Sequence, residues 1–361
     1  MKIRRGFALV AAVVAALTVL ATVAPLVAQQ RNNNNNNNQR PQRNKTEQVD
    51  VETLVRLVDG VAGGIQQAPA DVPIAWESNH FVKGQDGITY LPFTLNIDRS
   101  KLSKGDVAFY VRVVSKNPTP APTPAPAAEA KGDAKNQPPP RPVYPWDNIS
   151  FIEVPSNGKL SRAIALRPGQ YEAFIAIKEK GTDQRNAPPS KMGLLRKDLS
   201  IPDYNLPELA TSSILVASAI EVLTAALPPA QQEENPYTFG PMKIGLSSDG
   251  KFSKSGELNL VFWIYGAGAA AAGKPDVQID YAFHQKLAEG EKYFNRTQPQ
   301  VLNAQSLPPE FDVAAGHQLP GTLTVPLASF PSGDYRLEIK VTDKTSGKSV
   351  VQNVSFTVLP T

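Results

Sequence analysis

The chain has 361 residues, of which 41% are apolar and none is cysteine, and its formal net charge is +4. The length suffices for two or three domains, and the lack of cysteine excludes disulfide scaffolds and thiolate metal sites. Seven of the 37 basic residues lie in the first 45 positions, so the remaining 30 face 33 acidic residues. Since no basic concentration is left in the rest of the chain, we expect no nucleic-acid partner.

The first 28 residues have the layout of an export signal. Lys2, Arg4 and Arg5 precede an uncharged apolar run over residues 7–28, and we expect cleavage after Ala28. The run is also long enough to span a bilayer, so an uncleaved inner-membrane anchor stays open as the alternative. The sequence thus predicts a periplasmic or secreted bacterial protein, attached to a membrane only if this segment is not cut.

The next two segments link the signal to the first domain. Residues 29–48 include seven consecutive asparagines and offer nothing apolar to bury, which predicts a disordered arm. Residues 49–71 place Val51, Leu54 and Val58 at helical spacing before a glycine cluster. This pattern predicts a short amphipathic helix followed by a linker.

Residues 72–202 are expected to form a first β-sandwich. Its predicted strands are short, separated by turn residues and not interleaved with amphipathic helices, as an antiparallel sandwich requires. They span residues 88–97, 106–114, 149–154, 159–166, 170–178 and 192–201. A Pro-Thr-Ala-rich segment, residues 117–142, interrupts them and is interpreted as a loop without a core.

After a linker over residues 203–211, residues 212–361 are expected to form a second β-sandwich. Helix and strand compete for residues 212–220, and we favour the strand because of the β-branched cluster. The other predicted strands span residues 242–248, 257–265, 277–285, 291–295, 321–329, 334–343 and 349–358. The Ala- and Gly-rich residues 266–275 are interpreted as the counterpart of the Pro-rich loop.

An internal duplication supports two copies of one fold. Residues 158–181 match residues 321–347 after a one-residue insertion, and both place apolar side chains at alternate positions behind a Gly-x-Tyr. Residues 104–114 and 255–265 are aligned as a second pair. Period-two alternation is what a half-buried strand requires. The fold class predicted is therefore all-β: two tandem immunoglobulin- or fibronectin-like antiparallel sandwiches after a signal helix and a disordered arm.

The glycines and tyrosines of the repeat are interpreted as structural tyrosine corners. Gly169 with Tyr171, and Gly333 with Tyr335, open a strand after a turn, where a Tyr hydroxyl bonds nearby backbone. A pair of ligand-stacking aromatics is the alternative. Trp263 points away from the apolar side of its predicted strand, which makes it a candidate exposed aromatic for a glycan, with a second buried layer as the alternative.

No catalytic, cofactor-binding or metal-binding residues are expected. The three histidines, His80, His284 and His317, are not at ligand spacing, and no Gly-x-Ser-x-Gly occurs. The segment at 345–349 looks like the end of a phosphate-binding loop but lies between two predicted strands and lacks the first glycine, so it is interpreted as a hairpin turn.

Three segments carry a resemblance: residues 201–218 (IPDYNLPELATSSILVAS), 235–266 (NPYTFGPMKIGLSSDGKFSKSGELNLVFWIYG) and 325–349 (VPLASFPSGDYRLEIKVTDKTSGKS). Over residues 201–359 the chain resembles the C-terminal β-sandwich region of exported acidobacterial proteins of the von Willebrand factor A-related or Gly-Trp-x-Thr-Asp type. It lacks both signature motifs, since the run from Asp98 to Leu102 matches the metal motif only in part. The resemblance therefore implies a sandwich without metal-dependent adhesion.

These features together predict an exported, non-catalytic protein that binds or scaffolds at the cell envelope. The expected partner is another envelope or secreted protein, or a glycan. Two alternatives stay open: an enzyme with a site between the domains, and a purely structural spacer.

Overall fold

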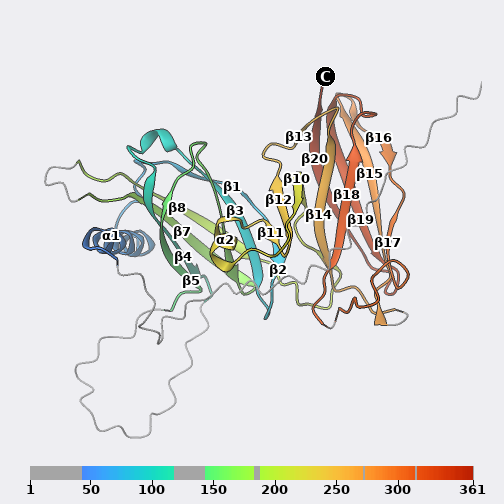
Figure 1. Cartoon of the computed structure of the whole chain (residues 1–361), viewed down its shortest axis with the longest axis horizontal. Coiled ribbons are helices and arrows are strands. Elements are labelled where there is room, and N and C mark those ends of the chain that lie inside the picture. Colours follow the sequence, from blue (N-terminus) through green and yellow to red (C-terminus); the bar gives the residue numbers. More distant parts are fainter. Residues whose placement is uncertain (1–42, 118–142, 183–187, 271–272, 314, 361) are drawn as a thin grey trace, which may run out of the picture. The chain divides into compact units, whose positions relative to one another are not determined.

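The computed structural model describes residues 43–117, 143–182, 188–270, 273–313 and 315–360 (Figure 1). They form two compact units. The first sandwich comprises residues 43–79 and 88–203, and the second comprises residues 80–87 and 204–360. The predicted export signal, residues 29–42 of the predicted arm and nearly all of the Pro-rich segment lie outside the described residues. No helix among the described residues is long and apolar enough to cross a membrane.

The first sandwich consists of one helix and two antiparallel sheets. One sheet has the order β1-β3-β6 and the other β5-β4-β7-β8. The elements are α1 (Lys45–Ala62), β1 (Ile74–Asn79), β3 (Thr89–Ile97), a 3-10 turn (Arg99–Lys101), β4 (Asp106–Ser115), β5 (Trp146–Glu153), β6 (Lys159–Leu166), β7 (Gly169–Glu179) and β8 (Met192–Ile201).

The second sandwich also has two sheets. The orders are β11-β12-β10-β14-β18, with β9 beside β14, and β13-β20-β19-β15-β16, with β17 beside β15. The elements of this unit are β2 (Val82–Lys83), which lies in neither of these two sheets, and β9 (Ala210–Thr211), β10 (Leu215–Val222), α2 (Pro229–Glu234), β11 (Thr238–Phe239), β12 (Met242–Leu246), β13 (Lys251–Ser253), β14 (Glu257–Tyr265), β15 (Val277–Leu287), β16 (Gly290–Arg296), β17 (Gln300–Leu302), β18 (Leu319–Pro326), β19 (Gly333–Asp343) and β20 (Ser349–Leu359).

The all-β class predicted from the sequence is confirmed, and both units are immunoglobulin-like sandwiches. The duplicated segments occupy equivalent places in the two units. β7 lies between β4 and β8, just as β19 lies between β15 and β20, and each follows an edge strand of the opposite sheet, β6 or β18. Within residues 212–220, for which helix and strand competed, the chain forms the strand β10 from Leu215 onward.

The second aligned pair, residues 104–114 with 255–265, is wrong. β4 pairs with β7, whereas β14 pairs with β18 in the opposite sheet, so the counterpart of β14 is β3 and the counterpart of β4 is β15. Both segments alternate because both face a core, but alternation does not say which sheet a strand joins. The low-complexity segments are consequently not equivalent either, because one follows β4 and the other follows β14.

Helix α1 begins at Lys45, four residues before the predicted boundary. Asn44 accepts a hydrogen bond from the backbone of Glu47 (2.8 Å), and the Glu47 carboxylate accepts one from the backbone of Asn44 (3.3 Å). This capping box satisfies two backbone donors that would otherwise lack partners at the helix start. Residues 45–48, which were predicted as part of the disordered arm, therefore belong to the helix.

Candidate functional site: the covered and open sheet faces

The outer face of the β5-β4-β7-β8 sheet is covered by α1. In β7, Ala173, Ile175 and Ile177 face the core between the sheets, yet Phe174 and Ala176 on the other side are also buried. The continuous apolar run of β7 is the sequence signal for this cover, because a strand buried on both faces loses its alternation. The alternation at 173, 175 and 177 predicts only a half-buried strand, so the cover by α1 was not predicted from the sequence.

An apolar ridge of α1 packs on this face. Leu54, Leu57, Val58 and Val61 are each at most 6% exposed and form one cluster with residues of β4 and β7. The sheet side of the cluster consists of Ala108, Tyr110, Phe174 and Ala176. At about 1.5–3 kcal/mol for each fully buried aliphatic side chain, this ridge is the main source of docking free energy.

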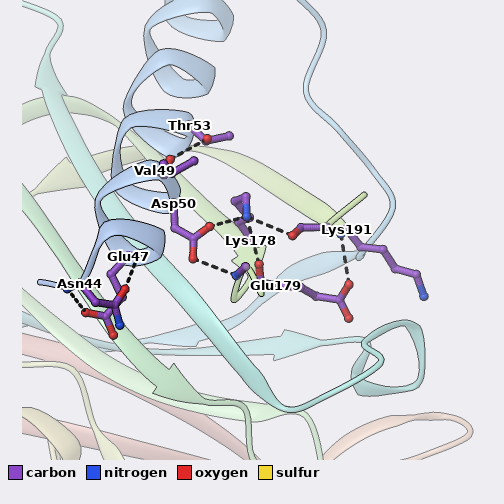
Figure 2. Close-up of polar contacts among 10 residues, drawn as sticks. Asn44, Glu47, Val49, Asp50, Thr53, Lys178, Glu179 and Lys191 are labelled. Atoms are coloured by element: carbon purple, nitrogen blue, oxygen red, sulfur yellow. Dashed lines mark hydrogen bonds and ion pairs between the residues drawn. The ribbon is translucent and has the colours of Figure 1, made fainter. Parts of the chain in front are cut away.

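A buried ion pair fixes the first half of the helix (Figure 2). Asp50 of α1 is 1% exposed, and its carboxylate lies 2.5 Å from the ammonium nitrogen of Lys178 on β7. The other carboxylate oxygen accepts a hydrogen bond from the backbone of Gly181 (2.9 Å). The Lys178 ammonium also donates to the Ser190 hydroxyl (3.1 Å) and the Glu179 carbonyl (3.2 Å). Both buried charges are thus compensated, as burial requires.

Two further ion pairs have the same polarity, with the acid on α1 and the base on the sandwich. Glu47 lies 3.0 Å from Lys180, and this contact holds the pKa of the Glu47 carboxyl below its usual value. Near the other end of the helix Asp59 pairs with Arg112, a buried residue of β4. This sheet face therefore recognises an acidic amphipathic helix.

Arg112 belongs to a compact polar group beside the helix. Its guanidinium lies 4.1 Å from the centre of the Tyr144 ring and 3.4 Å from the Asp147 carboxylate. Tyr110 donates a hydrogen bond to Asp147 (2.5 Å), and burial together with this contact raises the pKa of the Tyr110 hydroxyl. The polar groups of these residues pair with one another, so we interpret the group as structural.

Tyr171 and Tyr335 have the geometry expected of tyrosine corners. The Tyr171 hydroxyl donates to the Arg167 carbonyl (2.9 Å), and the Tyr335 hydroxyl donates to the Pro331 carbonyl (2.7 Å), each four residues back. Gly169 and Gly333 have φ angles of 152° and 141°, which L-residues with a Cβ rarely adopt. Both rings are buried, so neither offers a free face to a stacked ligand.

Trp263 is not an exposed aromatic, and that prediction is wrong. The residue is 1% exposed, and its ring centre lies 4.7 Å from that of Phe239. The side of β14 that faces away from the main core is itself covered by residues distant in sequence. Tyr204 packs on Tyr265 there, and the Lys83 backbone donates to the Tyr265 hydroxyl (3.0 Å). Alternation cannot reveal such a second layer.

The histidines are dispersed. His80 packs against Tyr237 in the second sandwich, and its Nδ1 lies 3.1 Å from the Tyr237 hydroxyl. Burial lowers the pKa of His80 to about 4. His284 is on β15, and His317 accepts a hydrogen bond from the backbone of Asp312. No group of three His, Asp or Glu side chains suited to a metal occurs among the described residues.

The equivalent outer face of the second sandwich, β16-β15-β19-β20, is open and polar. Arg336 on β19 donates to Glu291 (2.7 Å), Glu338 (3.0 Å) and Asn353 (2.6 Å), which joins β16, β19 and β20 in one network. Beside this network the rings of His284 and Tyr293 pack edge to face, with their centres 5.9 Å apart, and Tyr293 is 53% exposed. We call this surface the open face.

No family model matches the chain, and no curated protein matches it. Among solved structures the chain is similar to trypsin-activated alpha-2-macroglobulin from Escherichia coli, with a TM-score of 0.22 and 9% identity, over 82% of this chain and 17% of that one. It is also similar to a mutant of Salmonella alpha-2-macroglobulin, with a TM-score of 0.20 and 8% identity, over 81% and 17% of the two chains. The fold class stands on the strand pairing alone: an all-β protein of two immunoglobulin-like sandwiches.

Proposed function

We propose that this chain is an exported, non-catalytic β-sandwich protein that binds or scaffolds another protein at the bacterial cell envelope. The export layout of residues 1–28 and the resemblance over residues 201–359 to exported acidobacterial sandwiches support the location. A cleaved signal gives a periplasmic or secreted protein, and an uncleaved one gives an inner-membrane anchor.

One observation carries the binding role. Two equivalent sheet faces differ in their cover: the first is filled by α1, whereas the open face exposes a hydrogen-bonding network and an aromatic ring. Tyr and Arg side chains are types that dominate binding energy at protein interfaces, and this face carries the exposed Tyr293 and the half-buried Arg336. The open face is therefore the surface that we assign to a partner protein. A glycan is the alternative ligand, because the exposed Tyr293 ring lies beside the hydrogen-bonding side chains of the Arg336 network.

The test is capture of a partner by the exported chain from envelope extracts of its own bacterium, with chemical crosslinking, alongside a glycan array. The variant Tyr293→Ala removes the exposed ring, and Val313→Ala, at another exposed apolar residue of the same unit, is the matched control. We expect the first variant to lose the crosslinked partner and the second to keep it. An extract without any captured partner, together with a blank array, would contradict the proposal.

A further inference from the structure

The C-terminal half of β10 is an open sheet edge. β10 pairs with β14 only through Leu215, Val216 and Ala217, but it pairs with β12 as far as Val222. A register shift after Ala217 marks the point where β10 leaves β14. Beyond it, the edge of β10 that faces away from β12 has no strand partner among the described residues, and residues 218–222 are all exposed.

The hydrogen-bonding pattern between β10 and β12 shows which backbone N–H and C=O groups of β10 point to the open edge. The backbone N–H of Leu223 donates to the Pro241 carbonyl, so these two residues form a hydrogen-bonded pair of the antiparallel ladder with β12. Such pairs alternate along an antiparallel ladder. Glu221 and Ala219 consequently bond to β12, while the N–H and C=O groups of Ile220 and Val222 point to the open edge. Four main-chain groups are thus placed for an added strand.

The side chains favour addition as well. Ile220 and Val222 are 37% and 55% exposed, while their cross-strand neighbours on β12, Ile244 and Met242, are only 4% and 9% exposed. The apolar face of this sheet therefore runs on to its edge. Edge strands are usually protected by charges or proline, whereas residues 218–222 contain no Pro and a single charge, that of Glu221. In contrast, the edge strand β16 carries charges and the edge strand β18 carries two prolines.

We propose that residues 218–222 bind an extended segment of a partner protein as an added β-strand, with apolar residues opposite Ile220 and Val222 and a basic residue opposite Glu221. Glu221 sets the charge, because its side chain is 65% exposed and already lies 4.0 Å from Lys243 on the other side. Main-chain bonds supply affinity in this mode of recognition, and alternate side chains supply specificity. The inference rests on the proposed binding function and adds a site and a partner chemistry to it.

The probe is a dye-labelled peptide with the sequence of residues 241–247, PMKIGLS, because β12 already meets this apolar–basic–apolar pattern on the other edge of β10. It is added to the whole mature chain, and binding is followed by fluorescence anisotropy and amide hydrogen exchange. We expect slower exchange at the amides of Ile220 and Val222. A peptide with Glu in place of its Lys should bind about threefold to fivefold more weakly, as expected for a like-charge cross-strand pair.

The variant Ile220→Lys should weaken peptide binding about tenfold, because it places a charge against an apolar residue of the added strand and removes an apolar contact. Val222→Thr keeps strand propensity and is the second variant if the first does not fold. The matched control is Val351→Lys on β20, a strand without charged residues whose Val351 is 47% exposed; it should leave binding unchanged.

Two results would overturn this edge as the site. One is protection from exchange within β20 instead of residues 218–222, with Val351→Lys as the damaging variant. The other is unchanged peptide binding by Ile220→Lys, which leaves the binding role of the open face intact. If the wild-type chain captures no envelope partner, the proposed function fails along with the inference.

Discussion

Phe174 on β7 and Glu338 on β19 occupy equivalent positions in the two sandwiches, three residues after the corner tyrosine, but Phe174 is 1% exposed beneath α1 whereas Glu338 lies on the open face. The two strands have equivalent neighbours in their sheets, and both place apolar residues toward the core at alternate positions. Only the outward positions differ in character. The outward positions, of which Phe174 and Glu338 are one pair, therefore decide whether the sheet accepts a helix or faces water.

Exchanging the two residue types should therefore have opposite consequences. Phe174→Glu removes the buried ring under α1 and puts a carboxylate in its place, between Arg112 and Arg196 on the neighbouring strands. The lost packing should lower the free energy of unfolding of the first sandwich by about 3–5 kcal/mol. Glu338→Phe removes one exposed ion pair with Arg336 and should cost less than about 1 kcal/mol. Urea denaturation of both variants measures the difference. Equal effects of the two substitutions would contradict the assignment of a covered and an open face.

The buried pair Asp50–Lys178 should be strongly coupled. Asp50→Ala leaves the Lys178 ammonium buried without its counter-charge and should destabilise the first sandwich by about 3–5 kcal/mol. Asp50→Leu combined with Lys178→Met replaces the pair by apolar side chains and should recover most of that loss. A double-mutant cycle by chemical denaturation gives the coupling free energy. Arg56→Ala with Glu52→Ala, an exposed pair on the same helix, serves as the control and should show almost no coupling.

The sequence predicted the central strands of both sandwiches because alternation and turn residues are local signals, but it missed β1 and the short strands β11, β13 and β17. It could not assign β4 and β14 to their sheets, since the sheet a strand joins depends on partners distant in sequence. Trp263 shows the same limit, because its cover comes from β11 and the aromatic layer around Tyr265. The docking of α1 could be predicted only in part. Helical spacing predicted the helix, but Asp50 is a charged residue on its buried side, and its burial is explained only by the ion pair with Lys178.

The tyrosine corners should contribute similar free energies in the two sandwiches. Tyr171→Phe and Tyr335→Phe each remove a hydroxyl that donates to a carbonyl four residues back, and each should cost about 0.5–1.5 kcal/mol. Thermal unfolding followed by circular dichroism is the measurement. Tyr293→Phe removes an exposed hydroxyl and should leave the melting temperature unchanged. A lower melting temperature in only one of the two corner variants would contradict an equivalent role of the two tyrosines.

His80 should make the second sandwich less stable in acid. Burial lowers its folded-state pKa from 6.5 to about 4, so the unfolded chain binds more protons than the folded one between these values. This contribution to stability is complete above about pH 6.5 and is lost as the pH falls toward 4, by about 2–3 kcal/mol in all.

His80→Phe keeps an aromatic ring beside Tyr237 and removes the titrating group, so the fall in stability between pH 6.5 and pH 4 should become shallower. Urea denaturation across that range, followed by tryptophan fluorescence, to which Trp263 contributes, makes the comparison. His284→Phe, at a partly exposed histidine on β15, should keep the steeper dependence of the wild-type chain. If His80→Phe and the wild-type chain lose stability in parallel, His80 is not the group that titrates.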